Sequence, residues 1–176
     1  TGIQLCPNPE NKDLSKLQSF DEVMAAVKHQ LEYYDRQGAI ALLCIERAYA
    51  ELTPTPFASA LMDDCIQRGK DIEWGGAHYN TLFLRGVGMS NVGNSLAAIK
   101  KLVFEDKKLT GAQIMHALET NLEDTSTTPT GPEIQQMLLA APKYGNDDDY
   151  VDLLVKEATG HARREVRRYT SGTGAT

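Results

Sequence analysis

Apolar side chains recur every three or four positions over long stretches of this chain, and that spacing predicts helices with one buried face. The first stretch covers residues 19–68 and the last covers residues 110–169. Between them, residues 92–103 carry a similar apolar stripe, with most charged side chains off it. Gly38 interrupts the first stretch, so residues 19–52 form either one long helix with a kink or two helices in sequence. The chain is therefore predicted to be mainly helical.

Capping residues mark several of these helix ends. Ser19 and Thr110 are followed three residues later by Glu22 and Gln113, the capping-box spacing in which each side chain satisfies a backbone N–H of the other residue. Gly69 is placed to end the helix before it, since glycine is the usual residue just past a helix C-terminus. Helices are therefore expected to start after Ser19 and Thr110, and one is expected to end at Gly69.

The stretch GGAHYNTLFL breaks the helical pattern at residues 75–84. It is short, aromatic and bounded by glycines, which favours a strand over residues 77–84. Its nearly continuous apolar run after Asn80 indicates a strand buried on both faces. A glycine turn and a helix would follow, so residues 75–108 form the strand-turn-helix unit of an α/β protein. The predicted fold class is α/β, mainly helical.

Composition and charge limit the class of protein. The net charge of −6 and the pI near 5.2 argue against nucleic acid as a partner. Every apolar run is shorter than the roughly 18 residues of a membrane-spanning helix, so no membrane partner is expected. Cys6, Cys44 and Cys65 are odd in number and widely spaced, which favours neither a disulfide framework nor a zinc site. A reducing cytoplasm fits this cysteine usage best.

Candidate chemistry gathers at the predicted strand. His78 lies there next to Tyr79 and Asn80, and a polar cluster inside a sheet needs hydrogen-bond partners. The glycines of residues 86–93 fit neither a Walker loop nor a secure dinucleotide fingerprint. Residues 146–149, NDDD, lack the alternating ligands, the glycine and the final Glu of a calcium loop, so capping of the last helix explains them better. Residue types alone therefore yield no complete catalytic constellation and no cofactor or metal site.

Three ordered motifs extend this interpretation: DDCIQRGKDIEWGGAHYN at residues 63–80, VGNSLAAIKKLVFEDKKLT at 92–110 and APKYGNDDDYVD at 141–152. Two further stretches, SFDEVMAAVKHQLEYY and TPFASALMDDC, precede them. In this order, the five stretches resemble the glycyl radical enzymes related to pyruvate formate-lyase, closest to the dehydratase, lyase and decarboxylase branch. The resemblance covers nearly the whole chain.

The resemblance implies a ten-stranded α/β barrel and an anaerobic lyase. In this family a partner activating enzyme, which uses an iron–sulfur cluster and S-adenosylmethionine, converts a backbone glycine into a radical. That radical generates a cysteine thiyl, which abstracts hydrogen from a small organic substrate. Neither the family's Gly-Cys loop nor its RVxGY-like glycine motif occurs here, so residues 1–176 are expected to be an internal part of a larger barrel domain, inactive alone. No catalytic, cofactor-binding or metal-binding residue is therefore assigned.

The resemblance also implies that the predicted strand lines or backs the substrate cavity, with His78, Tyr79, Asn80 and Phe83 as candidates for the pocket wall or for the layer of residues just behind it. Where many relatives have Arg, this chain has His78, which removes a permanent charge, and where many have Asp it has Asn94. Diol dehydration, aryl-acid decarboxylation and C–N or C–S cleavage stay open, because the residues that choose among them lie largely outside this segment. The expected partners are a small-molecule substrate, the radical-activating enzyme and further copies in a homo-oligomer.

An autonomous helical interaction module without catalysis is the alternative hypothesis. Its contact surfaces would be the polar loop of residues 123–131 and the arginine cluster HARREVRRY at residues 161–169. A lyase segment instead predicts exposed apolar faces where the rest of the barrel would pack, and hence self-association. A monomeric chain without such faces would favour the module.

Overall fold

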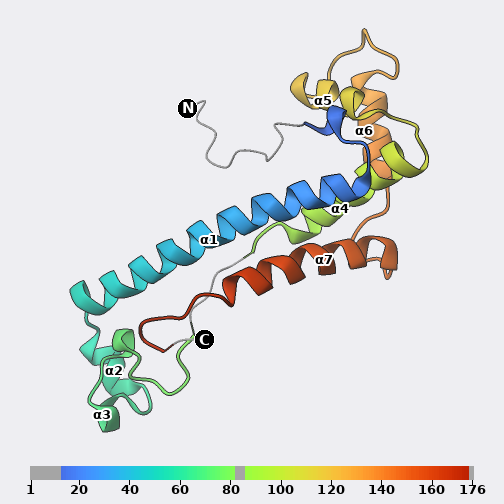
Figure 1. Ribbon diagram of the computed structural model, residues 1–176. Coiled ribbons are helices and arrows are strands. Elements are labelled where there is room, and N and C mark those ends of the chain that lie inside the picture. The colour runs from blue at the N-terminus through green and yellow to red at the C-terminus, as the bar shows by residue number, and fades with distance from the viewer. Residues whose placement is uncertain (1–12, 82–85, 175–176) are drawn as a thin grey trace. The chain divides into compact units, whose positions relative to one another are not determined.

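The computed structural model describes residues 13–81 and 86–174 of the chain (Figure 1). These residues form helices joined by turns and loops, and this described part contains no β-strand. None of the helices described here is both long and apolar enough to cross a membrane. The prediction of a mainly helical chain is confirmed.

The helices follow one another along most of the described chain. A 3-10 turn at Leu14–Lys16 comes first, a second at Ile72–Trp74 follows α3, and a π-helix at Lys100–Glu105 continues α4. Residues 20–52 form one helix rather than two, because the helix runs through Gly38 without interruption. The α-helices are α1 (Phe20–Leu52), α2 (Pro56–Leu61), α3 (Cys65–Arg68), α4 (Met89–Ile99), α5 (Gly111–Glu119), α6 (Gly131–Ala140) and α7 (Asp149–Val166).

The chain divides into two compact units. Unit 1 contains Thr1–Glu32 and Val87–Ala162, and unit 2 contains Tyr33–Gly86 and Arg163–Thr176. Helices α1 and α7 therefore each contribute residues to both units. The candidates for substrate contact belong to unit 2.

Unit 1 is built on two apolar clusters. The first joins the beginning of α1 to α4 and α7, and the second joins α5 and α6 to the π-helix and to Leu109 after it (Figure 1). Thr110 begins α5 with the complete capping box that its spacing to Gln113 predicts. Burial of these apolar faces is the main stabilising term of the unit. The buried members are Val23, Met24, Leu96, Ala97, Val151 and Leu154 in the first cluster, and Leu102, Leu109, Ile114, Ala117 and Ile134 in the second.

In unit 2, the helix that is expected to end at Gly69 is broken in the middle. Helix α2 ends at Leu61, and Asp64 has a φ of +74°, in the left-handed region, before α3 begins. The break turns both Ser59 and Cys65 inward, where they are 8% and 2% exposed. Gly69 ends α3 in the left-handed conformation, as its position in the sequence predicts.

The predicted strand is not formed over residues 77–81, which have bends and no strand pairing. Residues 82–85, and with them Phe83, lie outside the described residues. A strand is stabilised by hydrogen bonds to a neighbouring strand, and the described part of the chain supplies none. Local β-propensity at residues 77–81 is therefore overridden by the absence of a pairing partner in that part.

Candidate functional site

The segment GGAHYN, residues 75–80, crosses unit 2 as an irregular loop. Tyr79 is 90% exposed and His78 is also exposed, and their ring centroids lie 5.1 Å apart in an edge-to-face arrangement. Asn80 is partly buried. The structure thus brings His78 and Tyr79 together on the open side of the segment and turns Asn80 inward, while Phe83 lies outside the described residues.

Just before this segment, the carboxylate of Asp71 accepts several hydrogen bonds. It accepts hydrogen bonds from the backbone N–H of Thr55 at 2.9 Å, from Ser59 Oγ at 2.9 Å and from the N–H of Glu73 at 2.9 Å. Thr55 Oγ1 adds a longer contact at 3.3 Å. Ser59 Oγ also accepts the N–H of Ile72 at 2.9 Å. The side chain of Asp71 therefore joins the start of α2 to the 3-10 turn at Ile72–Trp74.

The backbone carbonyl of Asp71 holds the second glycine of the segment, Gly76, while the N–H of Gly75 donates to the carbonyl of Ile72 at 3.0 Å. The Asp71 carbonyl oxygen accepts the N–H of Trp74 at 3.0 Å and that of Gly76 at 2.9 Å. Arg68 Nη1 donates to the carbonyl of Gly76 at 2.9 Å. A Cβ on Gly76 would collide with the backbone carbonyls before it and would lie 2.8 Å from Cys65 Sγ. Only glycine fits at this position, because the chain passes directly against its neighbours.

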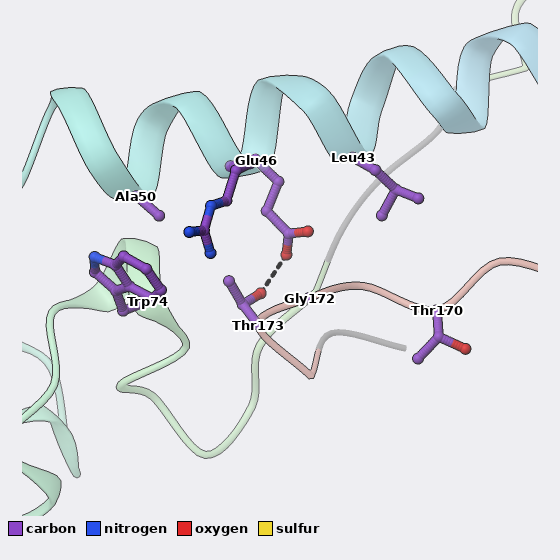
Figure 2. A pocket seen from close by; sticks show the side chains of 8 residues that line it. Leu43, Glu46, Ala50, Trp74, Thr170, Gly172 and Thr173 are labelled. Atoms are coloured by element: carbon purple, nitrogen blue, oxygen red, sulfur yellow. Dashed lines mark hydrogen bonds between the residues drawn. The ribbon is translucent and has the colours of Figure 1, made fainter.

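The far end of the segment is tied to α1 through a relay of hydrogen bonds. Asn80 Nδ2 donates to Thr173 Oγ1 at 2.9 Å. Thr173 Oγ1 in turn donates to the carboxylate of Glu46 (Figure 2). Ser171 Oγ donates to the same Glu46 oxygen. Gly75 has a φ of +72° and packs against the Thr173 carbonyl, so a side chain there would be strained and would also collide.

Both carboxylates are held in their ionised form. Burial raises the pKa of Glu46, but hydrogen bonds from the Ser171 and Thr173 hydroxyls and from backbone N–H groups outweigh that effect and hold the pKa below its ordinary value. Burial opposes ionisation of Asp71 as well, and the N–H of Glu73 and the Ser59 hydroxyl lead the hydrogen bonds that lower its pKa. Two acceptors with fixed charge therefore flank the segment.

A pocket of about 190 Å³ lies beside the relay in unit 2 (Figure 2). The guanidinium carbon of Arg47 lies 5.0 Å from the centre of the Trp74 ring and covers one face of it. Glu46 and Thr173 point toward each other at the pocket edge. The volume is enough for a side chain or a small molecule. The lining residues are Leu43, Glu46, Arg47, Ala50, Trp74, Thr170, Gly172 and Thr173.

The described residues contain no cluster of three or more His, Cys, Asp or Glu side chains that could hold a metal ion. The acidic run at residues 146–149 serves α7 instead: Asp148 Oδ1 accepts the N–H of Tyr150 at 3.0 Å, and Asp149 lies in the first turn. Acidic side chains at a helix start are favoured by the positive end of the helix dipole. This agrees with the prediction that the acidic run caps the last helix.

Sequence reasoning missed Asp71 and Glu46. Asp71 had a local signal, because an Asp immediately before a short turn commonly accepts an N–H two residues later. Glu46 had none, since its partners lie more than a hundred residues away along the chain. The first residue could have been suggested by turn chemistry, whereas the second required the tertiary structure.

Comparison with known proteins gives one consistent family. The family described as pyruvate formate lyase-like matches residues 1–176. The (2S)-3-sulfopropanediol dehydratase of Klebsiella oxytoca is 42% identical over 159 residues, which cover 89% of this chain and 18% of the relative. More distant relatives are named as a sulfite-lyase and a decarboxylase.

Solved structures similar to this chain belong to the same kind of enzyme. The glycerol-bound B12-independent glycerol dehydratase from Clostridium butyricum is 40% identical with a TM-score of 0.82, over 96% of this chain and 21% of that one. A glycyl radical enzyme from Archaeoglobus fulgidus is 28% identical with a TM-score of 0.76, over 92% of this chain and 20% of that one. The chain therefore spans about a fifth of the length of the relatives it matches.

Proposed function

Because this chain belongs to the pyruvate formate lyase-like family, we propose that it is an internal segment of a glycyl radical lyase and shapes that enzyme's barrel and substrate cavity. The observation that carries the proposal is the match over residues 1–176, together with fold similarity to glycyl radical enzymes over nearly the whole chain. The segment by itself is inactive and binds no cofactor or metal.

The proposed reaction removes a group from a small organic substrate after a cysteine thiyl abstracts a hydrogen atom. Dehydration is the reaction we favour, since the relative with 42% identity and the structure with a TM-score of 0.82 are both dehydratases. Decarboxylation and C–N or C–S cleavage are the alternatives within the same chemistry. The glycyl radical would be installed by an activating enzyme with an iron–sulfur cluster and S-adenosylmethionine, and the homo-oligomeric lyase would work anaerobically in the cytoplasm.

Within this enzyme, the segment at residues 75–80 is proposed to border the cavity. His78 and Tyr79 are the side chains suited to touch the substrate, because they are exposed and lie together. An imidazole can donate or accept a hydrogen bond near neutral pH, whereas the Arg of many relatives only donates. Asn80 supports the segment through Thr173. Phe83 stays a candidate for the cavity wall.

The test uses the full-length gene product that contains this chain, expressed anaerobically with its activating enzyme. A glycyl radical signal in electron paramagnetic resonance and dehydration of glycerol, propane-1,2-diol or trans-4-hydroxy-L-proline are the expected results. The 176-residue chain treated in the same way should give neither signal nor product. A natural gene product no longer than this chain, or a radical on the isolated chain, would overturn the proposal and favour the interaction module.

A further inference from the structure

We infer that two carboxylates, Asp71 and Glu46, are positioning residues that hold the two ends of the segment at residues 75–80 and so orient His78 and Tyr79. The inference rests on the proposed function, in which this segment borders the substrate cavity. Neither carboxylate is assigned to the chemistry; each acts through the segment it holds.

At the first end, the side chain of Asp71 has its hydrogen-bonding capacity in use. Two donors converge on each of its oxygens: Glu73 N–H and Thr55 Oγ1 on Oδ1, and Thr55 N–H and Ser59 Oγ on Oδ2. Ser59 Oγ shares its single proton between Asp71 and the carbonyl oxygen of Thr55, which lies 2.8 Å away. A carboxylate with several donors on both oxygens has one orientation. The backbone carbonyl of Asp71, which accepts the N–H of Gly76, is fixed with it.

The fixed carbonyl of Asp71 matters because the backbone of Gly76 is held on both sides. Its N–H is held by Asp71 and its carbonyl by Arg68, so both peptide groups that flank this residue are anchored. Two residues later, the N–H of His78 donates to Asp64 Oδ2 at 3.3 Å. The direction of the backbone from Gly76 to His78 is therefore fixed by these hydrogen bonds, ahead of the exposed rings of His78 and Tyr79.

At the second end, the relay has a defined direction. Asn80 Nδ2 can only donate, so Thr173 Oγ1 accepts from it and must give its single proton to another acceptor. Glu46 is that acceptor, and its carboxylate cannot donate in return. The charge on Glu46 therefore fixes the Thr173 hydroxyl, whose bond to Glu46 is drawn in Figure 2. This hydroxyl is the group that accepts from Asn80.

Between these two anchors, His78 and Tyr79 are the exposed members of the segment. A short loop with both ends held and two exposed rings in its middle is preorganised, because the entropy of ordering it is lost on folding rather than on binding. Loosening either end is expected to weaken substrate binding while the radical chemistry, which lies elsewhere, stays intact.

The first test measures hydrogen–deuterium exchange in the full-length gene product that contains this chain. Asp71→Asn and Glu46→Gln should speed exchange across residues 74–81 by about tenfold, the scale expected when a hydrogen bond to a charged acceptor is lost. Asp63→Asn, an exposed Asp, and Asp21→Asn, also exposed and on the same helix as Glu46, are matched controls and should leave this exchange unchanged. Thr173→Val, compared with Thr170→Val, breaks the relay without a change of charge or shape and serves if a carboxylate variant fails to fold. Unchanged exchange in Thr173→Val and in the folded carboxylate variants would overturn the inference.

The second test uses the activated full-length enzyme with whichever of glycerol, propane-1,2-diol or trans-4-hydroxy-L-proline it converts. The carboxylate variants should raise KM by about three- to tenfold through misplacement of the segment, with an unchanged glycyl radical signal and a smaller change in kcat. A merely structural role would lower the amount of active enzyme and hence kcat, with KM unchanged, and that result would overturn the inference. If the wild-type enzyme forms no radical, the proposed function fails, and the exchange experiment still decides whether the two carboxylates hold the segment.

Discussion

Gly93 of α4 lies directly beneath Val155 of α7, so that a Cβ at position 93 would overlap Val155 Cγ2. Val151 lies on the other side of the same spot, 3.7 Å from where that Cβ would be. Glycine in a helix interior costs roughly 1 kcal/mol relative to alanine, yet here it lets two helices of unit 1 approach closely. Packing between the helices outweighs helix propensity at this position.

Gly93→Ala should therefore lower the free energy of unfolding by about 1–3 kcal/mol, because overpacking of a well-filled core outweighs the gain in helix propensity. Urea denaturation followed by circular dichroism measures this change. Val155→Ala opens the space that the new methyl group needs, so the double variant should lose less than the sum of the two single variants. Additive losses would show that the contact between these positions is not what requires glycine.

Lys107 has a φ of +53°, in the left-handed region that side chains disfavour. Lys107→Gly should raise the free energy of unfolding by about 0.5–1 kcal/mol, since strain at a Cβ in this conformation is relieved. Lys108→Gly is the matched control, because Lys108 is an exposed neighbour outside the left-handed region. It should destabilise the chain, since glycine adds flexibility to the unfolded state there and removes the exposed ion pair of Lys108 with Asp106. Equal effects of the two variants would contradict the prediction.

Asp124 anchors the loop after α5, and its pKa is lowered from 3.8 to about 2 by hydrogen bonds from Ser126 and from His116, whose Nε2 lies 2.7 Å from Asp124 Oδ2. A folded pKa below the unfolded value gives stability that is complete above pH 3.8 and is lost as the pH falls toward 2. The urea midpoint of Asp124→Asn should therefore fall less than that of the wild-type chain as the pH is lowered from 3.8 toward 2. Glu119→Gln on α5 is the control and should keep the wild-type pH dependence. Identical curves for wild type and Asp124→Asn would count against the loop anchor.

Phe57 and Leu61 are four residues apart on α2, hence on one face, and are 80% and 74% exposed. Such a face promotes self-association, so light scattering of the isolated chain should show a mass that rises with concentration. The variant with Phe57→Ser and Leu61→Ser should shift toward the monomer. Val87→Ser removes a single apolar side chain that is 88% exposed and should change the mass little. A wild-type chain that stays monomeric at every concentration would contradict both this prediction and the lyase-segment hypothesis.

Much of the local structure could be predicted from the sequence, because it depends on neighbours along the chain. The spacing of apolar residues indicated the helices, and Thr110 and Gly69 marked ends that the structure confirms. The break at Asp64 was not predicted, because the positive φ of Asp64 and the burial of Ser59 and Cys65 on its two sides are seen only in the folded chain. The cavity candidates His78 and Tyr79 were named from the resemblance, and their role remains a prediction.

The sequence by itself determined the family and the mainly helical character, since ordered motifs and a 3.6-residue period are properties of the linear chain. Only the tertiary structure decided how residues 75–80 are held. Residues 77–81 have the residue types of a strand, but pairing depends on a partner that local sequence does not specify. Glu46 and Thr173 are brought together by the folding of α1 and the segment after α7, at a separation of 127 residues. Hydrogen bonds between such distant side chains depend on the three-dimensional path of the whole chain, which no local pattern contains.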